Sequence, residues 1–148
     1  MNLFKAGMFK LHSGSTTDFK IDCDALTDED LEAVAQVLAR MLPPFGRVEG
    51  VPRGGLRLAE AMSHWAGGPP DRLVIVDDVL TTGKSMEKQK RGREAYGAVI
   101  FARGPCPPWV LPLFTMRSPL LVATEAQLRR TVRQTFDDEP LPFETSVG

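Results

Sequence analysis

Two adjacent carboxylates, Asp77 and Asp78, end an apolar run at residues 73–76 and lead into the loop Thr-Thr-Gly-Lys-Ser at residues 81–85. A continuous apolar run of this length is typical of a strand covered on both faces of a parallel sheet. Such sheets bind ligands at the carboxyl ends of their strands. Backbone N–H groups and hydroxyls in a loop that leads into a helix suit an anion, so the sequence predicts a phosphate site here.

The two acids repel a phosphate, so they must serve another group beside it. Vicinal hydroxyls of a sugar or a hydrated divalent cation would suit them, because ionised carboxylates only accept hydrogen bonds. A ribose with a 5′-phosphate combines these elements in one ligand. Asp77 and Asp78 would then accept hydrogen bonds from the 2′- and 3′-hydroxyls while the loop holds the phosphate.

Two other interpretations of this stretch are weaker. Gly83-Lys84-Ser85 also ends the ATP-binding motif G-x-x-x-x-G-K-[ST], but Asp78 stands where that motif has its first glycine. A carboxylate there would oppose the phosphates. Alternatively, the two acids only cap the following turn. Their position between a buried strand and a loop of hydroxyls and glycine favours a binding role.

Strands alternate with helices along the chain, which predicts an open α/β fold with a mostly parallel sheet flanked by helices. A small antiparallel piece is expected near residues 9–11 and 19–23, and a helix capped by Thr27 ends before Pro43. A second helix, at 56–65, should bury Leu56, Ala59 and Met62 or Ser63. The remaining expected elements are strands at 47–51, 73–76, 98–103 and 109–116, and helices at 85–97, with Gly92 as a weak point, and at 124–136.

The whole chain has 148 residues, 43% of them hydrophobic, and a net charge near −1. This predicts one domain with an N-terminal segment (1–25), an α/β core (26–136) and a loosely held tail (137–148). The charge argues against nucleic-acid binding. Two widely separated cysteines, no secretory pattern and no membrane-length apolar stretch favour a cytoplasmic protein with free thiols.

Three segments resemble the type I phosphoribosyltransferases. The stretch VIVDDVLTTGKS resembles their binding motif for phosphoribosyl pyrophosphate (PRPP), and EGVPRGG (49–55) is similar to their pyrophosphate loop. FKLHSGSTTDFKID (9–22) is similar to the opening of orotate phosphoribosyltransferases, where this segment belongs to a hood over the base. The resemblance spans roughly residues 9–103.

The resemblance implies Mg²⁺-dependent transfer of 5-phosphoribosyl from PRPP to a nucleobase, most readily orotate, with release of pyrophosphate. It assigns catalytic roles to Asp77, Asp78 and Arg53, and Mg²⁺ would be held through the ligand, with the two acids as candidate contacts. A homodimer is also expected. The implied PRPP-binding residues are Asp77, Asp78, Val79, Leu80, Thr81, Thr82, Gly83, Lys84 and Ser85, and the implied pyrophosphate loop is Pro52, Arg53, Gly54 and Gly55.

The implied base-contacting residues of the hood are His12, Phe19 and Lys20. His12 is either a base contact or a partly exposed histidine, and Phe19 either stacks on a base or belongs to the core. Neither His12 nor Lys20 is diagnostic of a particular base. With two isolated histidines, a protein-held zinc or iron site is not expected.

The chain departs from the orotate type between Gly55 and Arg72. Relatives of that type have a further strand and a mobile loop with a catalytic lysine there, and one helix fills most of this segment. The alternative function is therefore a non-catalytic or weakly catalytic PRPP- or nucleotide-binding module that acts as a sensor or partner protein. The cations that follow the predicted phosphate loop form either a basic wall beside an anionic ligand or a solvated helix face; they are Lys88, Lys90, Arg91 and Arg93.

Overall fold

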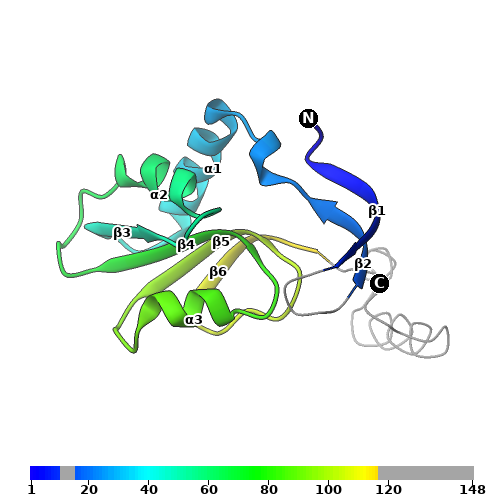
Figure 1. Cartoon of the computed structure of the whole chain (residues 1–148). Helices are drawn as coiled ribbons and strands as arrows, with labels where there is room; N and C mark the ends of the chain where they lie inside the picture. Colours follow the sequence, from blue (N-terminus) through cyan, green and yellow to red (C-terminus); the bar gives the residue numbers. More distant parts are fainter. Residues whose placement is uncertain (11–15, 117–148) are drawn as a thin grey trace, which may run out of the picture.

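A parallel four-stranded sheet forms the centre of the computed structural model, which describes residues 1–10 and 16–116 (Figure 1). The strand order is β3-β4-β5-β6, and Gly50 of β3 lies opposite Val76 of β4. His12, the predicted last helix and the tail lie outside the described residues. The strands are β3 (Arg47–Gly50), β4 (Leu73–Leu80), β5 (Tyr96–Ala102) and β6 (Val110–Thr115).

Helices cover both faces of this sheet, with α1 (Asp28–Met41) and α2 (Leu56–Ser63) on one side and α3 (Lys84–Lys90) on the other (Figure 1). Alternate residues of β4 point to opposite faces. Val74 and Val76 therefore pack with α1 and α2, while Ile75 packs with Met86 of α3. This confirms the predicted α/β fold class and explains the unbroken apolar run before the two acids.

The first helix follows its prediction closely. The Thr27 side chain accepts a hydrogen bond from the Asp30 N–H at 3.0 Å, and the Asp30 carboxylate accepts one from the Thr27 N–H at 2.9 Å, which completes a capping box. The helix ends at Met41, with Leu42 as its C-terminal cap, just before Pro43. A short 3₁₀ helix, η1 (Cys23–Ala25), joins α1 to the preceding strand.

Two details of the predicted helices were wrong. In α2 the buried residues are Leu58, Ala61 and Met62, while Leu56 is 50% exposed, because the helix starts there and its sheet-facing stripe begins two residues later. The helix predicted over 85–97 ends at Lys90. Arg91 and Gly92 both adopt left-handed backbone conformations, with φ of 56° and 70°, which ends the helix.

The N-terminal segment forms a separate two-stranded antiparallel sheet of β1 (Phe4–Lys10) and β2 (Thr16–Ile21), here called the hood (Figure 1). Lys5 of β1 forms a 2.8 Å ion pair with Asp22, which follows β2. This confirms the predicted antiparallel piece, although β1 starts earlier than expected. Within the described residues, no helix has both the length and the apolar character needed to cross a membrane.

Candidate active site

The sequence predicts a strand that ends just before the two acids, but Asp77 and Asp78 lie inside the carboxyl-terminal half of β4. The strand is longer than predicted because Val79 and Leu80 still pair with β5. Asp77 is 8% exposed and Asp78 is half-buried, and the Asp78 N–H donates to Oδ1 of Asp77 at 2.8 Å. Burial, and then the neighbouring Asp78 carboxyl, raise the pKa of Asp77 to about 8. Neither acid forms an ion pair with any cation in the described part of the chain. Within residues 1–10 and 16–116, the pair is therefore held without an ion-paired cation.

The predicted pyrophosphate loop lies directly against this pair. The Val51 N–H donates to the Val76 carbonyl at 2.8 Å, which fixes the start of the loop beside β4. A Cβ atom added at Gly54 would lie 2.6 Å from Cγ of Asp78, so only glycine allows the backbone to come this close. The Pro52–Arg53 peptide bond is cis. The fold thus joins two loops that the sequence could only propose separately.

The predicted phosphate loop follows β4 and leads into α3. Thr81, Thr82, Lys84 and Ser85 are exposed, whereas Gly83 is buried and has φ +82°, a backbone conformation that favours glycine. Four of the five loop residues therefore present side chains to solvent. Val79 and Leu80, the other members of the predicted PRPP-binding stretch, pack in the two core clusters and have structural roles.

A cavity of about 480 Å³ connects the hood, the acid pair and the pyrophosphate loop. Its lining includes Lys20 from the hood, Arg53 and Gly54 from the loop, and Asp78 from β4. Arg57 of α2, which sequence reasoning missed, also lines it. The residues at 81–85 do not line this cavity, so the phosphate loop is a separate part of the site.

Cys23 was also missed in the sequence, although it follows the hood motif directly. It lines the cavity, and burial followed by the nearby Asp78 carboxylate raises the pKa of its thiol to about 12. The thiol is therefore protonated at neutral pH and sits as a neutral group beside the acid. No spacing or pattern in the sequence indicates this proximity.

Phe19 of the hood contacts a buried arginine instead of lining the cavity. The guanidinium of Arg103 lies 4.4 Å from the centre of the Phe19 ring and donates to the Phe19 carbonyl at 3.3 Å. Arg103 is 8% exposed and immediately follows β5. It connects the hood to the carboxyl end of the sheet, and its place after an apolar strand was the signal that sequence reasoning overlooked.

The comparisons with known proteins agree with this geometry, although no family model matches the sequence. An orotate phosphoribosyltransferase of Methanothermobacter thermautotrophicus is 25% identical over 125 residues, which cover 68% of this chain and 69% of the relative. The solved orotate phosphoribosyltransferase of Aeropyrum pernix has a TM-score of 0.61 and 21% identity over 88% of this chain and 93% of its own. The chain has a type I phosphoribosyltransferase fold.

A second solved structure with this fold, the UMP synthase of Leishmania donovani, has a TM-score of 0.64 and 21% identity, and the match covers 90% of this chain but 36% of the longer enzyme. The predicted resemblance to orotate phosphoribosyltransferases is confirmed. Enzymes of that name are glycosyltransferases of the pentosyl class.

This phosphoribosyltransferase fold lacks a strand between α2 and β4. Residues 64–72 form turns, and the Gly68 N–H donates to the Phe45 carbonyl at 2.8 Å, which holds the connection close to the end of α1. The segment is fully described, and it contains neither the further strand nor the long loop of the orotate type. The predicted departure is therefore confirmed.

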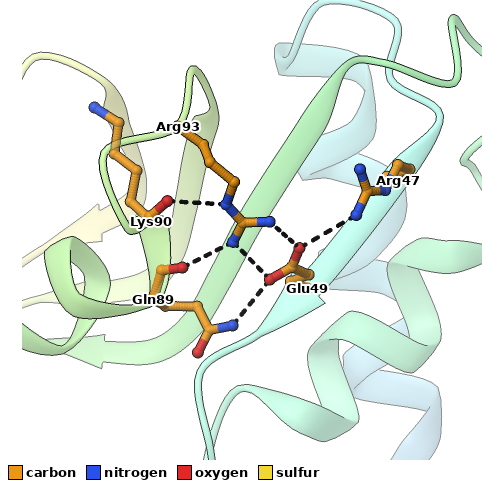
Figure 2. Close-up of polar contacts among 5 residues, drawn as sticks. All are labelled: Arg47, Glu49, Gln89, Lys90 and Arg93. Carbon is orange, nitrogen blue, oxygen red and sulfur yellow. Dashed lines mark hydrogen bonds and ion pairs between the residues drawn. The ribbon is translucent and has the colours of Figure 1, made fainter.

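A network of hydrogen bonds and ion pairs around Glu49 holds the strand that leads into the predicted pyrophosphate loop (Figure 2). Arg93 donates to both carboxylate oxygens of Glu49, at 2.7 and 2.9 Å, and Gln89 donates to one of them at 2.9 Å. Nη2 of Arg47 lies 3.6 Å from Oε2 of Glu49. Chiefly because of Arg93, the pKa of Glu49 falls to about 2. The network ties β3, which leads into the loop, to the segment that follows α3.

The cations of α3 and of the segment that follows it therefore divide into two groups. Arg93 pairs with Glu49, and the ammonium of Lys90 lies 4.6 Å from the centre of the Trp109 ring, so both have partners within the fold. Lys88 and Arg91 are exposed. Neither a continuous basic wall nor a fully solvated face describes the helix.

Protein side chains alone supply few ligands for a metal. Among the described residues, no group of three or more histidine, cysteine, aspartate or glutamate side chains gathers closely enough to hold an ion. The acid pair offers carboxylate oxygens, which Mg²⁺ prefers, and a ligand would have to supply the other oxygens. This donor set fits a magnesium ion that arrives with a phosphorylated substrate.

Proposed function

We propose that this chain is a Mg²⁺-dependent phosphoribosyltransferase that moves the 5-phosphoribosyl group of PRPP to a nucleobase and releases pyrophosphate. The observation that carries the proposal is the acid pair of β4, which has no ion-pair partner among the described residues. Asp77 is buried, and Asp78 lies against Gly54 of the predicted pyrophosphate loop. A site of this kind is complementary to a ligand with hydroxyl donors and a bound cation, and PRPP with Mg²⁺ provides both.

The parts of the ligand would occupy separate parts of the site. The ribose hydroxyls would donate to Asp77 and Asp78, and the 5′-phosphate would bind the exposed hydroxyls and N–H groups of the loop at 81–85. The pyrophosphate would lie at residues 52–55 beside Arg53, which lines the cavity. Bound magnesium would neutralise part of the charge that pyrophosphate gains as it leaves.

In the proposed reaction, a nitrogen of the base forms a bond to C1′ while the bond from C1′ to the pyrophosphate oxygen breaks. The electron pair of that bond leaves with pyrophosphate, and the base nitrogen gives its proton to solvent. Positive charge develops at C1′ in the transition state. Asp77 and Asp78 lie on the ribose side and would favour this charge, while Arg53 would favour the departing anion.

Orotate is the proposed acceptor. The similarity to orotate phosphoribosyltransferases supports it, and Lys20 of the hood lines the cavity, where its ammonium would suit the carboxylate of orotate. His12 stays a prediction for base contact, and so do the homodimer and the cytoplasmic location. Phe19 is a weaker candidate, because Arg103 lies over its ring and it does not line the cavity.

A second candidate is a PRPP- or nucleotide-binding module with little catalytic activity. The turn segment at 64–72 favours it, because loops that close over a site exclude water and complete its electrostatics, and this connection has none. Binding without turnover separates the two candidates.

The test is pyrophosphate release from PRPP and Mg²⁺ with orotate, compared with the double variant Asp77→Asn/Asp78→Asn. Release that requires orotate and falls by about 10³-fold or more in the variant would support the enzyme. If the wild-type protein releases none but binds PRPP in a calorimetric titration, the binding module is correct. Failure to bind PRPP at all rejects both.

A further inference from the structure

Arg57 is a cation of the cavity that belongs to none of the loops predicted from the sequence. It is the second residue of α2, and it lines the same cavity as Arg53, Gly54 and Asp78. The Leu56 N–H donates to the Arg53 carbonyl at 3.1 Å, so the pyrophosphate loop runs directly into the first turn of the helix.

Two hydrogen bonds hold the Arg57 side chain at one edge. Its Nη2 donates to the Leu26 carbonyl at 3.0 Å and to Oδ1 of Asp28 at 3.1 Å. Nε and Nη1 make no hydrogen bond to any other described residue. Because the Asp28 carboxylate is 95% exposed, this ion pair contributes little to stability. The guanidinium is therefore fixed at one nitrogen and has donors left for a ligand.

The charges around the cavity show what such a ligand would be. At the pyrophosphate end, Arg53 is the one charged residue of the loop at 52–55, and the Asp78 carboxylate lies against the same loop. Pyrophosphate carries several negative charges, so a single arginine beside a carboxylate compensates them poorly. A second guanidinium one turn further along would improve the balance, and its planar donors match phosphate oxygens.

We propose that Arg57 binds the pyrophosphate group of PRPP together with Arg53. This inference rests on the proposed function and identifies a further residue for it. Arg57 stabilises the anion as it departs and supplies positive charge in a site that has no long loop between α2 and β4. The bond to Leu26 sets the guanidinium in place before the ligand arrives.

The test measures binding of two separate probes by calorimetry, pyrophosphate with Mg²⁺ and ribose 5-phosphate. We expect Arg57→Gln to weaken pyrophosphate binding about tenfold or more and to change ribose 5-phosphate binding less than about twofold. Arg57→Lys keeps the charge but loses the planar fork, so it should give an intermediate loss. Arg40→Gln, which changes an exposed group of α1 away from the cavity lining, should leave both affinities unchanged.

The outcomes distinguish this inference from the function beneath it. If the wild-type protein binds neither probe, the proposed function fails. If it binds both and Arg57→Gln binds pyrophosphate as tightly, the role of Arg57 is rejected while the proposed function stands. An equal loss of both affinities, or a lowered melting temperature in circular dichroism that accounts for the loss, would make Arg57 structural and would also reject the inference.

Discussion

Glu49 and the acid pair Asp77/Asp78 differ in whether a cation of the described residues pairs with them. Glu49 lies behind the pyrophosphate loop, accepts hydrogen bonds from Arg93 and Gln89, and has a pKa of about 2. Asp77 lies at the end of β4, and burial beside Asp78 raises its pKa to about 8. The two acids are on neighbouring strands of one sheet, so the difference comes from the side chains that other elements bring to each acid.

The contrast between Glu49 and Asp77 distinguishes an acid that stabilises the fold from an acid that is suited to bind a ligand. The charge of Glu49 is neutralised by Arg93, and this ion pair holds β3 and the segment after α3 together (Figure 2). A buried acid pair without a cation costs stability, and such groups gather at sites that bind ligands. Among residues 1–10 and 16–116, the cations that form ion pairs do so with other acids than Asp77 and Asp78.

Among the variants that test this comparison, Gly54→Ala should have the largest effect, which is on PRPP turnover or affinity. The added methyl group would overlap the Asp78 carboxylate and move one member of the unpaired group by a fraction of an ångström. We expect PRPP turnover, or PRPP affinity if the chain only binds, to fall by about 10–100-fold. Gly67→Ala is the matched control, because a Cβ atom there meets nothing within 4 Å. Equal behaviour of the two variants would contradict the close approach of the loop to Asp78.

The next effect concerns the paired acid. Glu49→Gln should lower the free energy of unfolding by about 1–2 kcal/mol at pH 7, because it removes a charge-assisted pair of hydrogen bonds from Arg93. The folded pKa of Glu49 lies below its ordinary value of 4.5, so the stabilisation is present above about pH 4.5 and is lost as the pH falls toward 2.

Denaturant unfolding at several pH values checks this prediction, with Glu94→Gln, at an exposed position nearby, as the control. The difference in free energy of unfolding between wild type and Glu49→Gln should disappear as the pH falls, while the control variant keeps a free energy of unfolding near that of wild type. A difference that persists at pH 2 would mean that the ion pair is not its cause.

The last effect, which has the opposite sign, is expected for the stability of Asp77→Asn. The ordinary pKa of aspartate is 3.8 and that of folded Asp77 is about 8, so between these values the folded chain binds a proton that the unfolded chain releases. Stability therefore falls as the pH rises from about 4 to 8. The variant avoids this cost and should be more stable than wild type at pH 8, by an amount that grows as the pH rises from about 4.

Melting temperatures of wild type and Asp77→Asn across pH 4 to 8 provide the measurement. The two proteins should have the same melting temperature near pH 4, and the melting temperature of the variant should exceed that of wild type increasingly as the pH rises. A variant that melts below wild type at pH 8 would show that a protein group compensates Asp77 after all, which would remove the contrast with Glu49.

The sequence by itself indicated most of the elements and the two candidate binding loops. The apolar run before Asp77, the capping box at Thr27 and the alternation of strands with helices specify the α/β fold, because each is a local pattern with a local cause. The short connection between α2 and β4 could also be read directly. The end of α3 was harder to place, because two consecutive left-handed residues, one of them Arg91, ended it earlier than its composition suggested.

Only the tertiary structure decided which charges meet. Arg93 and Glu49 are far apart in the sequence, and so are Arg103 and Phe19, yet each pair is in contact. Arg57 shares a cavity with Asp78 for the same reason. Long side chains from different elements meet only when packing sets the distances between those elements, and no local pattern contains that information. That arrangement leaves the acids of β4 unpaired.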